Sequence, residues 1–325
     1  MGAAGTGLLV LTSAASALAG CVTAPDAACA ACHAAAPSTL FVSDRGISQV
    51  LRYDGDTGAF EDVFASAVDR IDRPAGVRLG PSGHVYVAGF GRGDIGRHDP
   101  RSGDRRDVFY ADTTLLEEPL DLVFRGSELL VLGNDTGNLV GLDAAGRVTR
   151  ELGYPDMRSA KDLTLAPDAR TVYVGVDSSI GGAANPSGGT AIQRWDVDTG
   201  VLLGTFGTSA ELASATSLAL RDDGTLYVAD WDRGQVLRYV AATGQLVDVV
   251  VEAASGTLQA PVALDLGPDG ALYVLDDLGI HRLDPDTGSE LGLIVATGDG
   301  HNVRPRAFTF VSETAIAQAI ARVSP

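Results

Sequence analysis

The residues best suited to chemistry lie near the start of the chain. Cys29 and Cys32 are separated by two alanines and followed directly by His33, the spacing at which c-type haem is attached. In that chemistry the two thiols bond the haem vinyl groups, and the histidine ligates the iron from one side. The same two cysteines could instead form a local disulfide in an oxidising compartment, act in thiol redox chemistry, hold a metal or have no role. The sequence leaves these alternatives open.

Cys21, the third cysteine, completes a different pattern. Residues 8–19 are apolar but too few to span a bilayer, and they lead into Leu18-Ala-Gly-Cys21. This resembles a bacterial lipobox, although no Lys or Arg precedes Leu8. It implies an exported protein of the bacterial cell envelope, periplasmic or at the cell surface, held on a membrane by a lipid on Cys21. An ordinarily cleaved secretory protein and a retained apolar tail are the alternatives.

The rest of the chain is organised by a repeat. Short turns, most of them beginning with Asp and all ending with Gly, occur at residues 54–58, 99–103, 143–146, 196–200, 240–244 and 284–288. Successive turns begin 45, 44, 53, 44 and 44 residues apart, which is the period of a four-stranded propeller blade. In these turns we expect Asp to cap its own backbone and Gly to adopt a positive φ, rather than a calcium loop.

Each repeat contains four segments typical of strands. The most regular are β-rich runs at 40–42, 85–87, 129–131, 172–174, 226–228 and 272–274. Another strand, often introduced by Pro, opens each following unit, as at 74–79, 119–124 and 261–266. The predicted fold is an all-β, six-bladed β-propeller. The C-terminal strand 306–311 is expected to pair beside Leu40 and close the ring, and the tail from Ser312 could be a helix or a strand.

The repeats also carry a family resemblance. Residues 226–239 look like an NHL repeat, and the six units are similar to NHL, gluconolactonase-like and streptogramin-lyase-like propellers. The resemblance implies the fold more than a function. Asn134, with Asp135 or Asp230, could supply two ligands of a lactonase-type divalent metal, but the expected first-blade Glu is absent, and no lyase-type His pair is found. We therefore assign no catalytic residue and favour binding over catalysis.

Domain organisation and charge follow from these patterns. We expect a signal peptide at 1–20, a linker with the Cys-His motif at 21–37, the propeller at 38–313 and a tail at 314–325. A net charge of −18 over 325 residues argues against nucleic-acid binding, which needs a basic surface. Only four residues separate His33 from the propeller, so a second haem ligand would come from the propeller, where Met157 is the single methionine, or from another chain.

Binding is expected on the face formed by the loops between second and third strands and between blades, because such loops vary on a rigid scaffold. The polar and aromatic residues predicted there are Asp44, Arg45, Arg73, Arg92, Asn134, Asp135, Lys161, Asp162, Asp177, Asp230, Trp231, Arg233, His301, Asn302 and Arg304. Residues 178–189 form an insertion, either a flap over the mouth or a tolerated surface loop. The expected function is binding of a protein partner or small ligand. One alternative is electron transfer through one covalent haem, and another is a metal-dependent lactonase or lyase.

Overall fold

The computed structural model describes residues 37–153, 157, 159–177, 189–208, 210–252, 255–298 and 300–323. These residues belong to a unit that spans Ala36–Pro325. The predictions for Cys21, Cys29, Cys32 and His33, for the signal peptide and for nearly all of the 178–189 insertion lie outside the described residues. Within them, no helix is long and apolar enough to cross a membrane.

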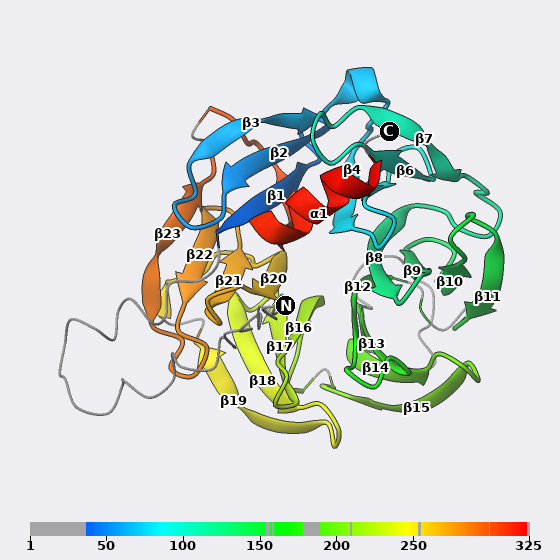
Figure 1. Cartoon of the computed structure of the whole chain (residues 1–325). Helices are drawn as coiled ribbons and strands as arrows, with labels where there is room; N and C mark the ends of the chain where they lie inside the picture. The colour runs from blue at the N-terminus through cyan, green and yellow to red at the C-terminus, as the bar shows by residue number, and fades with distance from the viewer. Residues whose placement is uncertain are drawn as a thin grey trace, which may run out of the picture. The chain divides into compact units, whose positions relative to one another are not determined.

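The propeller consists of six four-stranded antiparallel sheets, which are the blades, arranged as a ring (Figure 1). Blade 1 contains, from the inner to the outer strand, β24 (Pro305–Ser312), β1 (Ser38–Asp44), β2 (Gln49–Asp54) and β3 (Phe60–Ala65). Blade 2 contains β4 (Pro74–Leu79), β5 (Val85–Gly89), β6 (Asp94–His98) and β7 (Arg105–Tyr110), and a short 3-10 helix, η2 (Ala67–Asp69), precedes it. Blade 3 contains β8 (Pro119–Arg125), β9 (Glu128–Gly133), β10 (Asn138–Leu142) and β11 (Val148–Leu152).

The second half of the ring repeats this order. Blade 4 contains β12 (Ala160–Leu165), β13 (Thr171–Val176), β14 (Ala191–Asp196) and β15 (Val201–Phe206). Blade 5 contains β16 (Ala215–Leu220), β17 (Thr225–Asp230), β18 (Gln235–Val240) and β19 (Gln245–Val251). Blade 6 contains β20 (Ala263–Leu266), β21 (Leu272–Leu275), β22 (Gly279–Leu283) and β23 (Glu290–Ala296). The predicted all-β, six-bladed propeller is confirmed.

The ring closes within blade 1. The C-terminal strand β24 pairs antiparallel with β1, with Ser43 opposite Ala307 and Thr39 opposite Val311, as the sequence predicts. The tail forms the helix α1 (Glu313–Val323). Thr39 Oγ1 donates a hydrogen bond to Glu313 Oε1 at 2.8 Å, so the two ends of the propeller are joined by side chains as well as by strand pairing.

The hydrophobic core is divided among the six interfaces between blades. Each cluster of buried residues draws on two neighbouring blades. Between blades 1 and 2, for example, Phe41 packs edge-on against Phe64 at 4.9 Å between ring centroids, beside Val85 and Val87. Because both faces of a blade are covered, second strands such as β17 are buried on both sides, and an unclosed ring would expose one complete interface.

The repeated turns have the geometry predicted from their residues. Asp54 Oδ1 accepts hydrogen bonds from the backbone nitrogens of Asp56 and Thr57 at 3.1 and 2.7 Å. Gly58 has a φ of +70°. A Cβ atom at Gly58 would lie 1.8 Å from the carbonyl oxygen of Ile294 in blade 6. The glycine is therefore required by backbone conformation and by contact with the preceding blade.

The antiparallel strands give the ring two ends with different loops. The turn face bears the repeated turns between third and fourth strands. The mouth face bears the loops between second and third strands, such as the β1–β2 and β17–β18 loops, together with the connections between blades. Inside the ring, the six inner strands β4, β8, β12, β16, β20 and β24 surround a channel.

Candidate functional site

One backbone hydrogen bond recurs in every blade at the mouth face. In each blade, a residue one or two positions after the second strand donates its backbone N–H. The acceptor is the carbonyl of a residue one to four positions before the first strand of that blade. The six bonds are Arg45 to Arg304, Gly91 to Asp72, Asn134 to Glu118, Asp177 to Ser159, Trp231 to Ser214 and Asp277 to Gln259, at 3.1 to 3.2 Å. The mouth therefore has six structurally equivalent positions, at which the blades carry Arg, Gly, Asn, Asp, Trp and Asp.

Three blades hold this arrangement with a buried aspartate at the end of the second strand. Asp44 Oδ2 accepts the N–H groups of Val303 and Arg304 at 2.6 and 2.9 Å. Asp230 accepts those of Ala213 and Ser214 at 2.9 and 3.0 Å. Both aspartates are fully buried. Although they were predicted among the ligand-face residues, they position the mouth loops and present no exposed carboxylate.

Asp276 is the third member of this set. Its Oδ2 accepts the N–H of Gln259 at 2.6 Å, and its Oδ1 accepts that of Leu278 at 2.7 Å. His281 Nε2 lies 3.1 Å from the same Oδ1, and these partners lower the pKa of Asp276 although burial opposes the shift. The repeated aspartate is therefore part of the scaffold, and the residue that follows it is the one that varies.

A cavity of about 520 Å³ opens at the mouth. It is lined from blades 1, 2, 5 and 6 by Arg45, Arg73, Phe90, Trp231, Val262, Asp276, Asp277, Thr297, Val303, Arg304, Pro305 and Arg306. Trp231 is 42% exposed, whereas the other tryptophan, Trp195, is buried in the core. The lining thus combines four guanidinium groups with aromatic and aliphatic surface.

Arg45 occupies an electrostatically unfavourable position in this cavity. Its guanidinium carbon lies 3.9 Å from the centroid of the Phe90 ring, and that of Arg73 lies 5.2 Å from the same ring. Burial, together with the positive charges of Arg306, Arg73 and Arg304, lowers the pKa of Arg45 to about 9. Its Nε and Nη2 atoms are buried and have no hydrogen-bond partner among the described residues.

A polar cluster with negative charge lies on blade 3 of the mouth. Asn134 Nδ2 donates to Glu118 Oε2 at 3.1 Å and to Asp135 Oδ1 at 3.2 Å. Burial raises the pKa of Glu118. Lys161 lies at the mouth end of β12, where burial lowers its pKa and the neighbouring Asp177 opposes that shift. Positive and negative groups are thus unevenly distributed around the opening.

The channel below the mouth contains a second cavity, of about 220 Å³, with charges from several inner strands. Arg78 Nη2 lies 3.5 Å from Asp121 Oδ1. Asp162 Oδ2 accepts hydrogen bonds from Ser217 Oγ at 2.6 Å and Leu218 N at 2.7 Å. Burial and the adjacent carboxylate of Asp121 raise the pKa of Asp162 well above its usual value. Asp162, predicted on the mouth ring, therefore lies inside the channel.

Four other predicted residues lie outside the lining of the mouth cavity. Arg92 pairs with Asp94 at 3.3 Å, and Arg233 donates to the carbonyl of Glu211. His301 stacks on Phe60 with ring centroids 3.7 Å apart. Asn302 is buried and donates to the hydroxyl of Tyr53 at 3.2 Å. Each of these side chains has a packing or bonding role of its own.

Sequence reasoning omitted some residues that line the two cavities. Phe90, Asp277 and Arg306 line the mouth, and Arg78 and Asp265 line the channel. Asp277 had a usable signal, because aligning the repeats on the motif shared by residues 40–44, 226–230 and 272–276 places it beside Arg45 and Trp231. The inner-strand charges gave no such signal.

The structure limits which propeller residues could assist a haem or metal. Met157, the candidate second haem ligand, is fully buried in the cluster between blades 3 and 4. His98 is buried and bonded to the carbonyl of Gly103 at 2.8 Å, and His281 is buried between Asp276 and Glu290. Across the described ranges, no three His, Cys, Asp or Glu side chains are grouped in a way that could hold a metal.

Comparisons with known proteins support the fold. No family model matches the chain, and no curated protein does. Among solved structures, the chain is similar to one from a crystal structure of a nidogen/laminin complex, with 14% identity and a TM-score of 0.66, over 84% of this chain and 98% of that one. It is also similar to hydrazine synthase of Kuenenia stuttgartiensis, with 16% identity and a TM-score of 0.58, over 77% and 81% of the two chains. At these identities the likeness shows the fold alone.

Proposed function

We propose that this protein is an exported, lipid-anchored propeller that binds a ligand in the cavity at its mouth. The observation that carries the proposal is the cavity of about 520 Å³, lined by side chains that differ from blade to blade on a repeated backbone framework. Small-molecule sites usually measure roughly 300–1,000 Å³ and combine apolar walls with a few polar groups. The cavity meets both criteria.

Trp231 provides a direct test, because its exposed indole lines the cavity. In a Trp195→Phe background, Trp231 is the single tryptophan, and its fluorescence reports occupation of the mouth. We expect at least one compound from a panel of small anions, cations and neutral molecules to quench this fluorescence saturably and to raise the melting temperature. Trp231→Phe is the control that removes the signal. A panel that gives neither response would contradict ligand binding at the mouth.

A segment of a protein partner is the second candidate occupant. The exposed Trp231 supports it, because tryptophan and arginine are enriched among the residues that dominate protein interfaces. One structural neighbour comes from a nidogen/laminin complex. A photoreactive phenylalanine replacing Trp231 should then cross-link a defined partner in intact cells. The same residue replacing Thr57 on the turn face should not, and equal labelling from both positions would count against the mouth.

Export and anchoring rest on residues 8–21 and have their own test. Cys21→Ser should abolish lipid modification and move the protein from the membrane fraction to the soluble exported fraction, because the acyl chains supply most of the membrane affinity. Cys21→Ala is a second variant with the same expectation. Unchanged membrane partitioning in both would refute the lipoprotein assignment.

The spacing of Cys29, Cys32 and His33 supports a further candidate, electron transfer through one covalently attached haem. Protein produced together with a haem-attachment system should then show a Soret band that survives acid-acetone extraction. Cys32→Ser should lose this covalent attachment. A mass lower by two hydrogens, with no Soret band, would establish the competing disulfide instead.

A further inference from the structure

We propose that the ligand of the mouth is a small organic anion, whose carboxylate or phosphate oxygens pair with Arg45, Arg73 and Arg304 and whose apolar part packs on Trp231. This inference rests on the proposed function, because it assumes that the mouth is the binding site. It adds the charge and shape of the ligand. The supporting observations are the unpaired donors, the clustering of positive charge and the mixed lining of the cavity.

The unpaired donors of Arg45 are the atoms that other arginines of this chain use to bind carboxylates. Arg52, Arg97 and Arg238 each present Nε and Nη2 side by side to one aspartate, namely Asp62, Asp107 and Asp248. Arg45 has the same two donors buried without a partner among the described residues. A two-oxygen anion is the natural complement of this pair of donors.

Positive charge is concentrated in the mouth cavity although the whole chain carries a net charge of −18. Across the part of the chain that the structure describes, Arg45, Arg73, Arg304 and Arg306 make no ion pair, yet all four line one cavity. Of the two aspartates in the lining, Asp276 is already occupied by three backbone N–H groups and His281. An anion in the cavity would relieve the repulsion among the guanidinium groups.

The remaining lining indicates that the anion has an apolar part. Trp231, Val262, Val303 and Pro305 line the same cavity as the arginines. Phe90 has guanidinium groups of two arginines near its ring. A bare inorganic ion would leave the indole and the aliphatic surface in contact with water, whereas an aromatic or aliphatic carboxylate or phosphate ester would cover them.

The experiment titrates the full-length protein with four probes by calorimetry. Phenyl phosphate and benzoate carry the two candidate anions on one apolar body, benzyl alcohol is the neutral counterpart, and inorganic phosphate lacks the apolar part. We expect saturable binding of phenyl phosphate, benzoate or both, weakening at high salt because the interaction is between charges. The probe of these two that binds more tightly shows whether the site prefers a phosphate or a carboxylate. Benzyl alcohol and inorganic phosphate should bind more weakly.

Two arginines of blade 1 provide a matched pair of variants. Arg45→Met should lower the affinity for the anion by about tenfold or more. It should not lower the melting temperature, because it removes buried, unpaired donors and retains much of the side-chain volume. Arg52→Met should lower the melting temperature, because it breaks the pair with Asp62, and it should leave the affinity unchanged. Arg304→Gln is a second test of the site, should Arg45→Met fail to fold.

The outcomes separate this inference from the proposed function. Unchanged affinity for both anions in Arg45→Met and Arg304→Gln would overturn the anion site. Binding of benzyl alcohol in preference to both anions, with quenching of Trp231, would overturn the anion assignment and leave the mouth as a binding site. Inorganic phosphate binding as tightly as phenyl phosphate would overturn the role of Trp231. Failure of every probe in calorimetry and of the whole fluorescence panel would refute both.

Discussion

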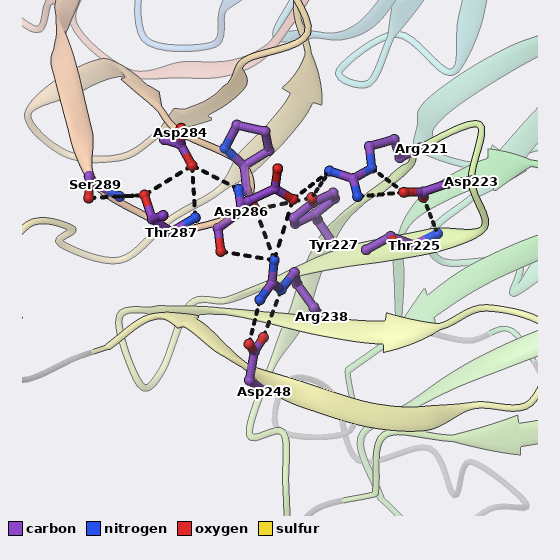
Figure 2. Close-up of polar contacts among 11 residues, drawn as sticks. Arg221, Asp223, Thr225, Tyr227, Arg238, Asp248, Asp284, Asp286, Thr287 and Ser289 are labelled. Atoms are coloured by element: carbon purple, nitrogen blue, oxygen red, sulfur yellow. Dashed lines mark hydrogen bonds and ion pairs between the residues drawn. The ribbon is translucent and has the colours of Figure 1, made fainter.

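The two ends of the propeller use arginine in opposite ways. On the turn face, Arg238 pairs with Asp248 and donates to the carbonyl oxygens of Pro285 and Asp286 at 3.3 and 3.1 Å. Figure 2 shows this residue between Asp248 and the turn of the next blade. Arg221 similarly joins Asp223 and Asp286. These arginines bind carboxylates and carbonyls of their own chain and connect blade 5 to blade 6.

In the mouth cavity, arginines gather without such partners, unlike Arg92 and Arg233 elsewhere on the mouth face. Arg45, Arg73 and Arg304 line one cavity, make no ion pair among the described residues and repel one another. A charged side chain without a partner in the fold lowers stability. Proteins tolerate that cost where binding requires the charge. This difference indicates that the turn face stabilises the ring, and it supports the proposal that the mouth face binds a ligand.

The largest expected effect is on a glycine of the turn face. Gly288 has a φ of +69°, and a Cβ atom there would lie 1.8 Å from the carbonyl oxygen of Val250 in the preceding blade. Gly288→Ala should lower the free energy of unfolding by about 3 kcal/mol, through backbone strain and this clash. Chemical denaturation measures the change.

Gly224 is the matched control for this prediction. It also has a positive φ, of +88°, but no atom lies within 4 Å of its missing Cβ. Gly224→Ala should therefore cost only about 1 kcal/mol. Equal losses in the two variants would show that docking between blades contributes little on this face.

The second prediction concerns the repeated aspartate of the mouth face, which should behave as scaffold. Asp44 accepts four backbone N–H groups and is fully buried. Asp44→Ala should lower the free energy of unfolding by about 3 kcal/mol, because those groups lose their acceptor. Asp277 is exposed and lines the mouth cavity, and Asp277→Ala should change the free energy of unfolding by less than about 0.5 kcal/mol. A larger loss for Asp277 would reverse the assignment of the two roles.

A moderate effect is expected for the network of Figure 2. Arg238→Met removes the hydrogen bonds to Asp248 and to the neighbouring turn. We expect the free energy of unfolding to fall by about 1 kcal/mol, a modest loss because Asp248 is partly exposed to solvent. Arg147→Met, which removes an exposed arginine paired with Asp143, is the control. Thermal unfolding that does not distinguish the two variants would contradict a stabilising role for the network.

The smallest effect concerns the channel between the two faces. The pKa of Asp162 is raised in the folded protein by burial and by Asp121, so the folded state holds this proton more tightly than the unfolded chain. The associated stability is complete below the unfolded pKa of about 3.9 and is lost as the pH rises through the folded pKa. Asp162→Asn replaces the protonated acid with an amide that does not ionise. The variant should therefore not lose this stability as the pH rises.

The measurement is the free energy of unfolding against pH for wild type and Asp162→Asn. The variant should gain relative to wild type as the pH rises, by an amount on the order of 1 kcal/mol. Asn can still accept the hydrogen bonds from Ser217 and Leu218. Two parallel curves would contradict the raised pKa. Arg78, Asp265 and Arg306 also face this channel. They are the same in wild type and in Asp162→Asn.

Much of the fold could be predicted because its signals are local. The turn spacing, the alternation of the strands, the prolines that open β4 and β8 and the proline before β20 each depend on neighbouring residues. Closure was predictable too, because β24 was left without a partner in its own repeat. The helix α1 was not decided by its sequence, since its short, alanine-rich pattern suits a helix or a strand until it packs beside β24.

The site was predictable only in part, for a related physical reason. Residues 45, 134, 161 and 231 could be assigned to the mouth face by their positions within the repeat. Whether a side chain such as Asp44 is bonded inside the scaffold or, like Arg45, is presented to the cavity depends on backbone amides from another part of the chain. A local sequence pattern does not predict contacts with such distant amides.

The sequence by itself therefore determined the ring, its number of blades and the face on which its loops vary, because these follow from a periodic pattern of strands and turns. Only the tertiary structure decided which charges meet. Arg45, Arg73 and Arg306 are far apart in the sequence and line one cavity because closure brings the last strand beside the first. Electrostatic interaction depends on distance in space, and the folded ring alone sets that distance.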